Sequence, residues 1–76
     1  MSRIIEYEEL KTLSNNQLSE LTEGRGVFLY MHDGTMNEVR IKYIVGNDIF
    51  SAKFIDCTGL EFYRQNVKRI EILDSF

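Results

Sequence analysis

The sequence predicts a mainly β fold, in which an N-terminal α-helical segment precedes a five-stranded antiparallel small barrel. Over residues 27–72 of the 76-residue chain, short apolar-rich segments alternate with compact turns. Strands this short leave exposed edges unless the sheet closes on itself, and a barrel closed within about fifty residues has no interior room for a substrate. We therefore expect one domain over residues 1–76, with the helical segment at 6–23 and the barrel at 27–73.

The helical segment is predicted from four leucines between positions 10 and 21, which fall within one arc of a 3.6-residue wheel. Ser14 and Gln17 have the spacing of a capping box, so a second helix can begin at Ser14. The sequence leaves open whether the segment is one helix or two. Gly24 and Gly26 then end it.

The first two strands form a predicted hairpin. Residues 27–32 are apolar on both alternating sides, and Asp33-Gly34 is a strong signal for a tight turn because Gly adopts positive φ at low cost. In the returning strand, 38–45, charged residues alternate with an apolar set that we assign to the barrel interior. That set is Val39, Ile41, Tyr43 and Val45.

Three further strands complete the predicted barrel. Glycine-containing and polar turn signals separate them from the hairpin and from one another. In order, the elements are a turn at 46–48, a strand at 49–56, a turn at 58–59, a strand at 60–64, one helical turn at 65–66 and a closing strand at 67–72.

Composition limits where the protein acts. Hydrophobic residues make up 43% and charged residues 28% of the chain, as in ordinary globular proteins. No apolar run approaches the roughly 18 residues of a membrane helix, and the N-terminus turns acidic where a signal peptide would continue apolar. With the single cysteine Cys57 there is no internal disulfide. We expect a cytoplasmic protein that neither spans a membrane nor is secreted.

Residues that carry catalytic or metal chemistry are few. The single histidine, His32, lies at a strand end, and Cys57 has neither a second cysteine nor a histidine near it in sequence. Asp33, Asp48 and Asp56 fall at turns, where turn formation accounts for each. We therefore expect no enzymatic activity, no cofactor and no metal site.

The charge distribution favours a protein partner. The net charge is −3, and residues 1–38 carry three Lys/Arg against seven Asp/Glu. Acidic surfaces oppose general nucleic-acid binding but can block a basic site on another protein. We therefore predict a non-enzymatic regulator that binds, and inhibits or modulates, a protein of the transcription or RNA-processing machinery. The predicted contact residues are Glu6, Glu8, Glu9, Glu20, Glu23, Asp33 and Asn47.

Direct binding of RNA or single-stranded nucleic acid is the alternative. Strand alternation places several basic side chains and a tyrosine on outward faces, where cations hold phosphates and rings stack on bases. The residues of this alternative are Arg40, Lys42, Lys53, Tyr63, Arg64, Gln65 and Lys68.

The order of elements resembles the Sm-like branch of the SH3-like small barrels over about residues 14–73. The closing segment is similar to the second Sm motif of the bacterial Hfq proteins, with Gln65 where Hfq has a base-contacting histidine. That segment reads Tyr63-Arg64-Gln65-Asn66-Val67-Lys68-Arg69-Ile70. A further similarity, to WYL-type regulatory barrels, involves residues 49–52 and Arg69-Ile70.

The whole chain also resembles the Rof family of Rho-termination inhibitors, small acidic proteins with an N-terminal helix on an Sm-like barrel. The similar segments are Glu6-Tyr7-Glu8-Glu9-Leu10, Leu29-Tyr30-Met31-His32-Asp33-Gly34, Leu60-Glu61-Phe62-Tyr63-Arg64 and Val67-Lys68-Arg69-Ile70. The resemblance implies a protein that covers the RNA-binding surface of a nucleic-acid machine with its acidic helix. Sm-like proteins often form rings and Rof-like proteins need not, so the oligomeric state stays open.

Overall fold

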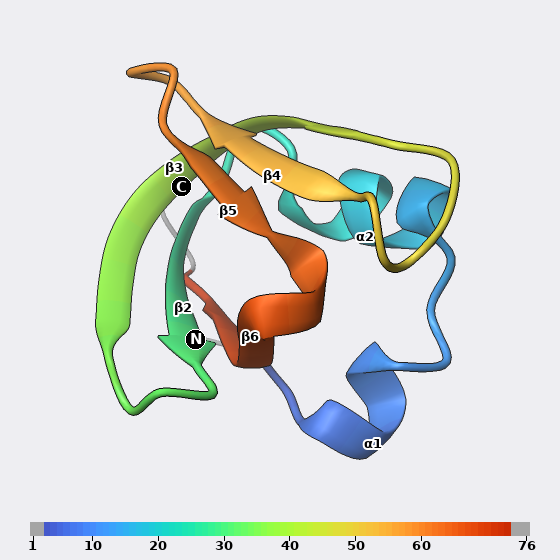
Figure 1. The fold of residues 1–76 in the computed structure, drawn as a ribbon. Helices are drawn as coiled ribbons and strands as arrows, with labels where there is room; N and C mark the ends of the chain where they lie inside the picture. Colours follow the sequence, from blue (N-terminus) through green and yellow to red (C-terminus); the bar gives the residue numbers. More distant parts are fainter. Residues whose placement is uncertain (1–2, 74–76) are drawn as a thin grey trace.

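One antiparallel sheet of six strands carries two helices in the computed structural model, which describes residues 3–73 (Figure 1). The ends of the predicted domain, residues 1–2 and 74–76, lie outside the described residues. In chain order the elements are β1 (Arg3–Ile5), α1 (Tyr7–Leu10), α2 (Asn15–Thr22), β2 (Gly26–Met31), β3 (Met36–Val45), β4 (Lys53–Asp56), β5 (Glu61–Tyr63), the 3-10 helix η1 (Arg64–Asn66) and β6 (Val67–Ile72). The mainly β prediction is confirmed.

The sheet is not a closed barrel, and the predicted closure is wrong. Its strand order is β1-β6-β2-β3-β4-β5, so β1 and β5 are its two edges. The predicted number of strands is also wrong, because Arg3–Ile5 pairs antiparallel with residues 70–72 of β6. A three-residue strand is too short to show the period-two alternation by which strands are recognised, and the partner of this one lies near the other end of the chain.

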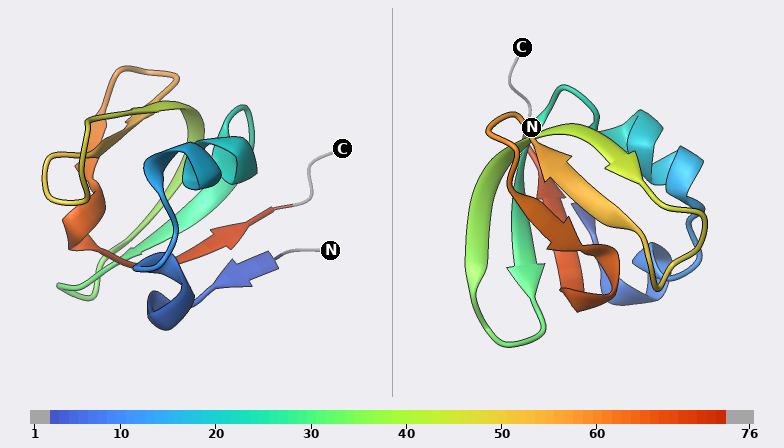
Figure 2. Two further views of the ribbon diagram at one scale, coloured as in Figure 1. Left: turned by 90° about the vertical axis from the view of Figure 1, so that its right-hand side faces the viewer. Right: turned by 45° about the horizontal axis from the view of Figure 1, so that its top comes forward.

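Strand β3 bends through both halves of the sheet (Figure 2). Its first half pairs with β2 and its second half with β4, and the register with β4 shifts between Ile41 and Tyr43. The extra residue, Lys42, forms a bulge that reverses which side chains face inward. Tyr43 and Val45 are therefore 40% and 39% exposed, contrary to their predicted interior position, and Ile44 packs on the core instead.

The helical segment divides into two helices, which settles the alternative left open by the sequence. Ser14 caps α2 through a reciprocal pair of bonds: its Oγ accepts from the Gln17 N–H at 3.1 Å, and its own N–H donates to Gln17 Oε1 at 2.8 Å. This capping box starts α2 afresh after the single turn of α1. Neither helix is long and apolar enough to cross a membrane within residues 3–73.

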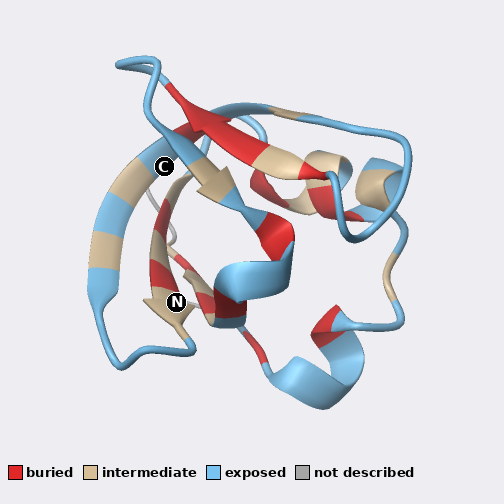
Figure 3. Cartoon of the chain, in the orientation of Figure 1, coloured by how far each residue is buried: buried red, intermediate tan, exposed pale blue. Residues whose placement is uncertain are grey.

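The hydrophobic core lies between the inner face of the sheet and the apolar sides of the two helices (Figure 3). Helix α2 packs against β3, and α1 packs against β6. The buried members of this core are Ile5, Leu10, Leu18, Val27, Leu29, Ile41, Phe54, Val67, Ile70 and Ile72.

The predicted strand at 49–56 is only half present, because β4 begins at Lys53. Asp48 Oδ1 accepts the Ser51 N–H at 2.8 Å and the Ser51 hydroxyl at 3.0 Å, and its carbonyl accepts the Ala52 N–H at 3.1 Å. These local bonds compete successfully with a strand ladder. Phe50 consequently stands 74% exposed in the loop. The helical turn predicted at 65–66 is confirmed as η1.

Candidate functional site

Arg64, a predicted nucleic-acid contact, is buried and holds the fold together instead. Only 2% of the residue is exposed, and its guanidinium donates to the Asn15 Oδ1 at 2.6 Å, to the Leu10 carbonyl at 2.8 Å and to the Leu13 carbonyl. Burial lowers the pKa of this guanidinium, yet arginine remains charged in proteins. The prediction that Arg64 faces a nucleic acid is wrong, because the last carbonyls around α1 need its donors.

Asn15 extends this link to the loop after β3. While its Oδ1 accepts from Arg64, its Nδ2 donates to the carbonyls of Gly46 at 3.2 Å and Asp48 at 3.3 Å. The first turn of α2, η1 and the 46–48 loop are thus tied at one side chain. This loop carries Asn47, a predicted protein contact, which is exposed.

The other basic candidates do not form one free cationic surface. Arg40 Nη1 donates to the Gly24 carbonyl at 2.7 Å, and Lys53 Nζ lies 3.2 Å from Glu61 Oε1. The bond to Glu61, followed by its charge, raises the pKa of Lys53. Two cationic side chains are thus already engaged within the fold.

The structure does bring some residues of this set together on the outer face of β3, β4 and β5. Lys53 and Tyr63 are cross-strand partners, and Lys53 Nζ lies 5.2 Å from the Tyr63 ring centroid. In β3, which pairs with β4, Lys42 Nζ lies 5.9 Å from the ring centroid of the next residue, Tyr43. Gln65 in η1 and Lys68 in β6 are exposed on other elements. The structure therefore shows a tyrosine–lysine surface, which includes the Tyr43 that was predicted to be interior, where the sequence predicted a basic face.

The acidic candidates are divided between two areas. Around α1, Glu6, Glu8 and Glu9 each have a cation nearby. The pairs are Glu9 with Arg3 at 2.6 Å, Glu8 with Lys11 at 3.3 Å and Glu6 with Arg69 at 4.0 Å. Exposed pairs of this kind contribute little to stability, but they reduce the net negative charge of this area.

The second acidic area is on α2. Glu20 and Glu23 are exposed and, with Asn16 and Ser19, line a shallow hollow of about 320 Å³. The Ser19 hydroxyl donates to Glu23. Among the described residues, no lysine or arginine pairs with either glutamate. This helix presents the uncompensated part of the predicted acidic surface.

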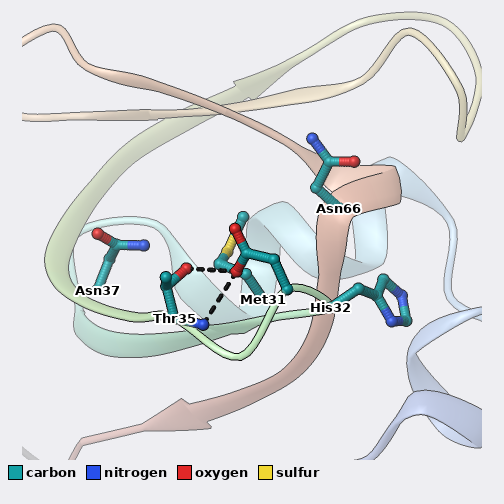
Figure 4. A pocket seen from close by; sticks show the side chains of 6 residues that line it. Met31, His32, Thr35, Asn37 and Asn66 are labelled. Atoms are coloured by element: carbon teal, nitrogen blue, oxygen red, sulfur yellow. Dashed lines mark hydrogen bonds between the residues drawn. The ribbon is translucent and has the colours of Figure 1, made fainter.

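Asp33 belongs to a separate pocket between the β2–β3 hairpin and η1 (Figure 4). The hairpin is fixed to η1 by the His32 N–H, which donates to the Asn66 carbonyl at 2.9 Å. The His32 ring lies 5.2 Å from that of Tyr7 in an edge contact, which ties the hairpin to α1. The pocket measures about 350 Å³, and its lining residues are Met31, His32, Asp33, Thr35, Asn37 and Asn66. We call it the hairpin pocket.

The hairpin pocket is polar at its rim. Asp33 Oδ1 accepts both the Thr35 hydroxyl at 2.6 Å and the Thr35 N–H at 2.9 Å. The bond from the Thr35 hydroxyl has the larger effect and the bond from the Thr35 N–H the smaller one. Together they hold the pKa of the Asp33 carboxyl below its ordinary value of 3.8, so the carboxyl is anionic at neutral pH. The carboxamides of Asn37 and Asn66 make no hydrogen bond to another described residue. Of these residues, Asp33 was predicted from its sequence and the two asparagines were not, because η1 folds back onto the hairpin only through long-range strand pairing.

Of the residues considered for catalytic or metal chemistry, His32 and Asp33 line the hairpin pocket, and Asp48, Asp56 and Cys57 lie outside it. Cys57 is exposed, and His32 contacts Tyr7. Within residues 3–73, no three His, Cys, Asp or Glu side chains come together in a way that could hold a metal ion.

A pH dependence is expected from Asp56, whose Oδ1 accepts the Thr58 hydroxyl at 2.7 Å and the backbone N–H groups of Thr58 and Leu60 at 2.9 Å. These bonds, led by the Thr58 hydroxyl, lower the pKa of Asp56 below 3.8. The contribution of Asp56 to the free energy of unfolding is therefore complete above pH 3.8. It is lost as the pH falls through the lower pKa that Asp56 has in the folded state. Asp56→Asn should flatten the acid side of a plot of urea midpoint against pH. Glu20→Gln, which removes a carboxylate without such bonds, should leave the acid side of this plot unchanged. Equal slopes on the acid side for the wild type, Asp56→Asn and Glu20→Gln would contradict this assignment.

Comparison with models of known protein families, with curated proteins and with solved structures finds no match to this chain. Its function is therefore inferred from the arrangement of its own side chains.

Proposed function

We propose that this chain is a non-enzymatic small regulatory protein that binds, and inhibits or modulates, a protein of the transcription or RNA-processing machinery. One observation carries the proposal: the negative charge of α2 is exposed and not compensated by a described lysine or arginine, whereas Arg64, Arg40 and Lys53 are each bonded to another group of the chain. An acidic surface of this kind is complementary to a basic nucleic-acid site.

The Sm-like and Rof resemblances are part of this proposal. In support, β2 to β6 are five consecutive antiparallel strands, the long β3 is bent, and one 3-10 turn joins the last two strands. Two acidic helical turns precede them. We infer a small barrel-like module that acts in the cytoplasm and covers an RNA-binding surface on its partner.

The experiment is RNA binding by purified termination factor Rho, measured as fluorescence anisotropy of a labelled oligonucleotide while the chain is added. The wild-type chain should release the RNA. Glu20→Lys/Glu23→Lys should weaken this competition about tenfold or more, because two attractive contacts become repulsive. Glu38→Lys/Glu61→Lys, which changes the net charge equally on the sheet, is the matched control and should compete like the wild type. The proposal is contradicted if the RNA stays bound to Rho at a saturating concentration of the chain, or if both double variants lose the same degree of competition.

RNA binding is the second candidate, and it is favoured by the two lysine–tyrosine pairs on the outer face of β3, β4 and β5. Exposed rings beside cations can stack bases and hold phosphates. A direct titration of the chain with the same oligonucleotide over a series of salt concentrations tests it. Several phosphate contacts predict affinity that falls steeply with salt. Absence of binding at low salt rejects this candidate, and Tyr63→Ala should abolish any binding seen.

A further inference from the structure

The hairpin pocket has an inner wall made by the core face of the sheet. Asn37 lies opposite Leu29 in the β2–β3 ladder, and cross-strand partners share a face, so its carboxamide lies on the same side of the sheet as a fully buried leucine. Met31 follows two residues later on that face and adds an apolar surface. Asn37 is half-buried and makes no side-chain hydrogen bond to another described residue. Its carboxamide is therefore open to water or to a ligand.

The opposite side of the hairpin pocket supplies a negative charge. The turn uses only Oδ1 of Asp33, and the second oxygen, Oδ2, accepts no bond from another described residue. Asn66 contributes a second carboxamide, while its backbone carbonyl is occupied by the His32 N–H. The pocket therefore offers one anionic acceptor, two amide acceptors and the Met31 thioether, and the described residues that line it include no lysine or arginine.

This set of groups discriminates between ligand classes. A phosphate or nucleotide would bring negative charge to Asp33, which is unfavourable. Lysine and arginine both have an apolar stem, but a lysine ammonium is a compact point charge, whereas a planar guanidinium presents five donors in a fixed fork. At about 350 Å³ the pocket lies near the lower end of ligand sites, which run from about 300 to 1,000 Å³. It suits one side chain better than a cofactor.

We propose that the hairpin pocket is a subsite for an arginine side chain of the partner protein, with Asp33 Oδ2 and the Asn37 and Asn66 carboxamide oxygens as acceptors. The inference rests on the proposed function, because it assumes a protein partner, and it adds the residue that this partner inserts. It also gives the predicted contact Asp33 a role apart from the α2 surface.

The test is an NMR titration of the full isotope-labelled chain with N-acetyl-arginine methylamide. The side-chain NH₂ signals of Asn37 and Asn66 should shift and saturate. The citrulline analogue, which has the same shape without the charge, should produce no saturable shift. The lysine analogue should bind more weakly than the arginine analogue. A saturable shift with the citrulline analogue overturns the proposal. So does a result in which uridine monophosphate or adenosine monophosphate shifts these signals and the arginine analogue does not.

Two matched variants separate charge from folding. Asp33→Asn retains an Oδ1 acceptor for Thr35 and removes the negative charge, so affinity for the arginine analogue should fall about tenfold, as for loss of a charge-assisted bond. Asp48→Asn makes the same change in another loop outside the pocket, where the carboxylate accepts the N–H and the hydroxyl of Ser51, and should leave affinity unchanged. Equal affinity of the Asp33→Asn variant and the wild type also overturns the proposal. The titration contains no partner, so its failure is distinguishable from failure to displace RNA from Rho.

Discussion

Gly46→Ala is expected to lower the free energy of unfolding by about 3 kcal/mol or more, because two costs act at this one position. Gly46 has φ +118°, which side-chain-bearing residues rarely adopt, and an added Cβ would lie 2.6 Å from the Ala52 Cα and 2.9 Å from its nitrogen. Those atoms are backbone and cannot move aside as a flexible side chain can. Urea unfolding followed by circular dichroism measures the loss.

The matched control is Gly59→Ala. Gly59 has φ +91°, but nothing lies within 4 Å of the position of an added Cβ. This variant therefore reports the backbone cost alone, about 1 kcal/mol. A loss at Gly46 no larger than the loss at Gly59 would show that the loop moves away from Ala52 freely.

Arg64→Met is the second large effect, with an expected loss of about 3–5 kcal/mol. Methionine fills much of the volume but has no donors, so the Leu13 carbonyl and the Oδ1 of Asn15 would lose their partner, and the Leu10 carbonyl would keep only the Leu13 N–H. Arg64→Lys keeps the charge but not the fork of donors, and should fall between methionine and the wild type. Thermal and urea unfolding measure both variants.

Arg40→Met is the control for this series, because Arg40 is exposed and its guanidinium donates to one group of residues 3–73, the Gly24 carbonyl. Its loss should stay within about 1 kcal/mol. Should Arg64→Met prove as mild as Arg40→Met, the network through Asn15 would carry little of the stability.

Much of the fold was visible in the sequence because its signals are local. The Asp33-Gly34 turn, the Ser14 capping box and the helical turn at 65–66 depend on residues that are neighbours in the chain. Strand β1 and the bulge at Lys42, which reverses the side chains that face inward, depend on pairing between distant segments. A bulge inserts one residue without any change in composition, so the alternation of β3 continued in the sequence where the structure reversed it.

The candidate site was less predictable for the same reason. Exposure of the glutamates followed from their charge and helical spacing. The burial of Arg64 depends on the carbonyls of Leu10 and Leu13, which only the folded chain brings to it. Asn37 and Asn66 look like ordinary polar residues in the sequence. Their proximity in one pocket arises from the pairing of β2 with both β3 and β6.

The Arg64 contacts also have a consequence for biosynthesis. They join residues 49 to 54 positions apart, so both helices are made long before the side chain that fastens them exists. Helices as short as α1 and α2 are marginal alone in water. We therefore expect the nascent N-terminal segment to stay unstructured until residue 64 has been synthesised and has left the ribosome, so that the two helices dock only after β2 to β5 have been made.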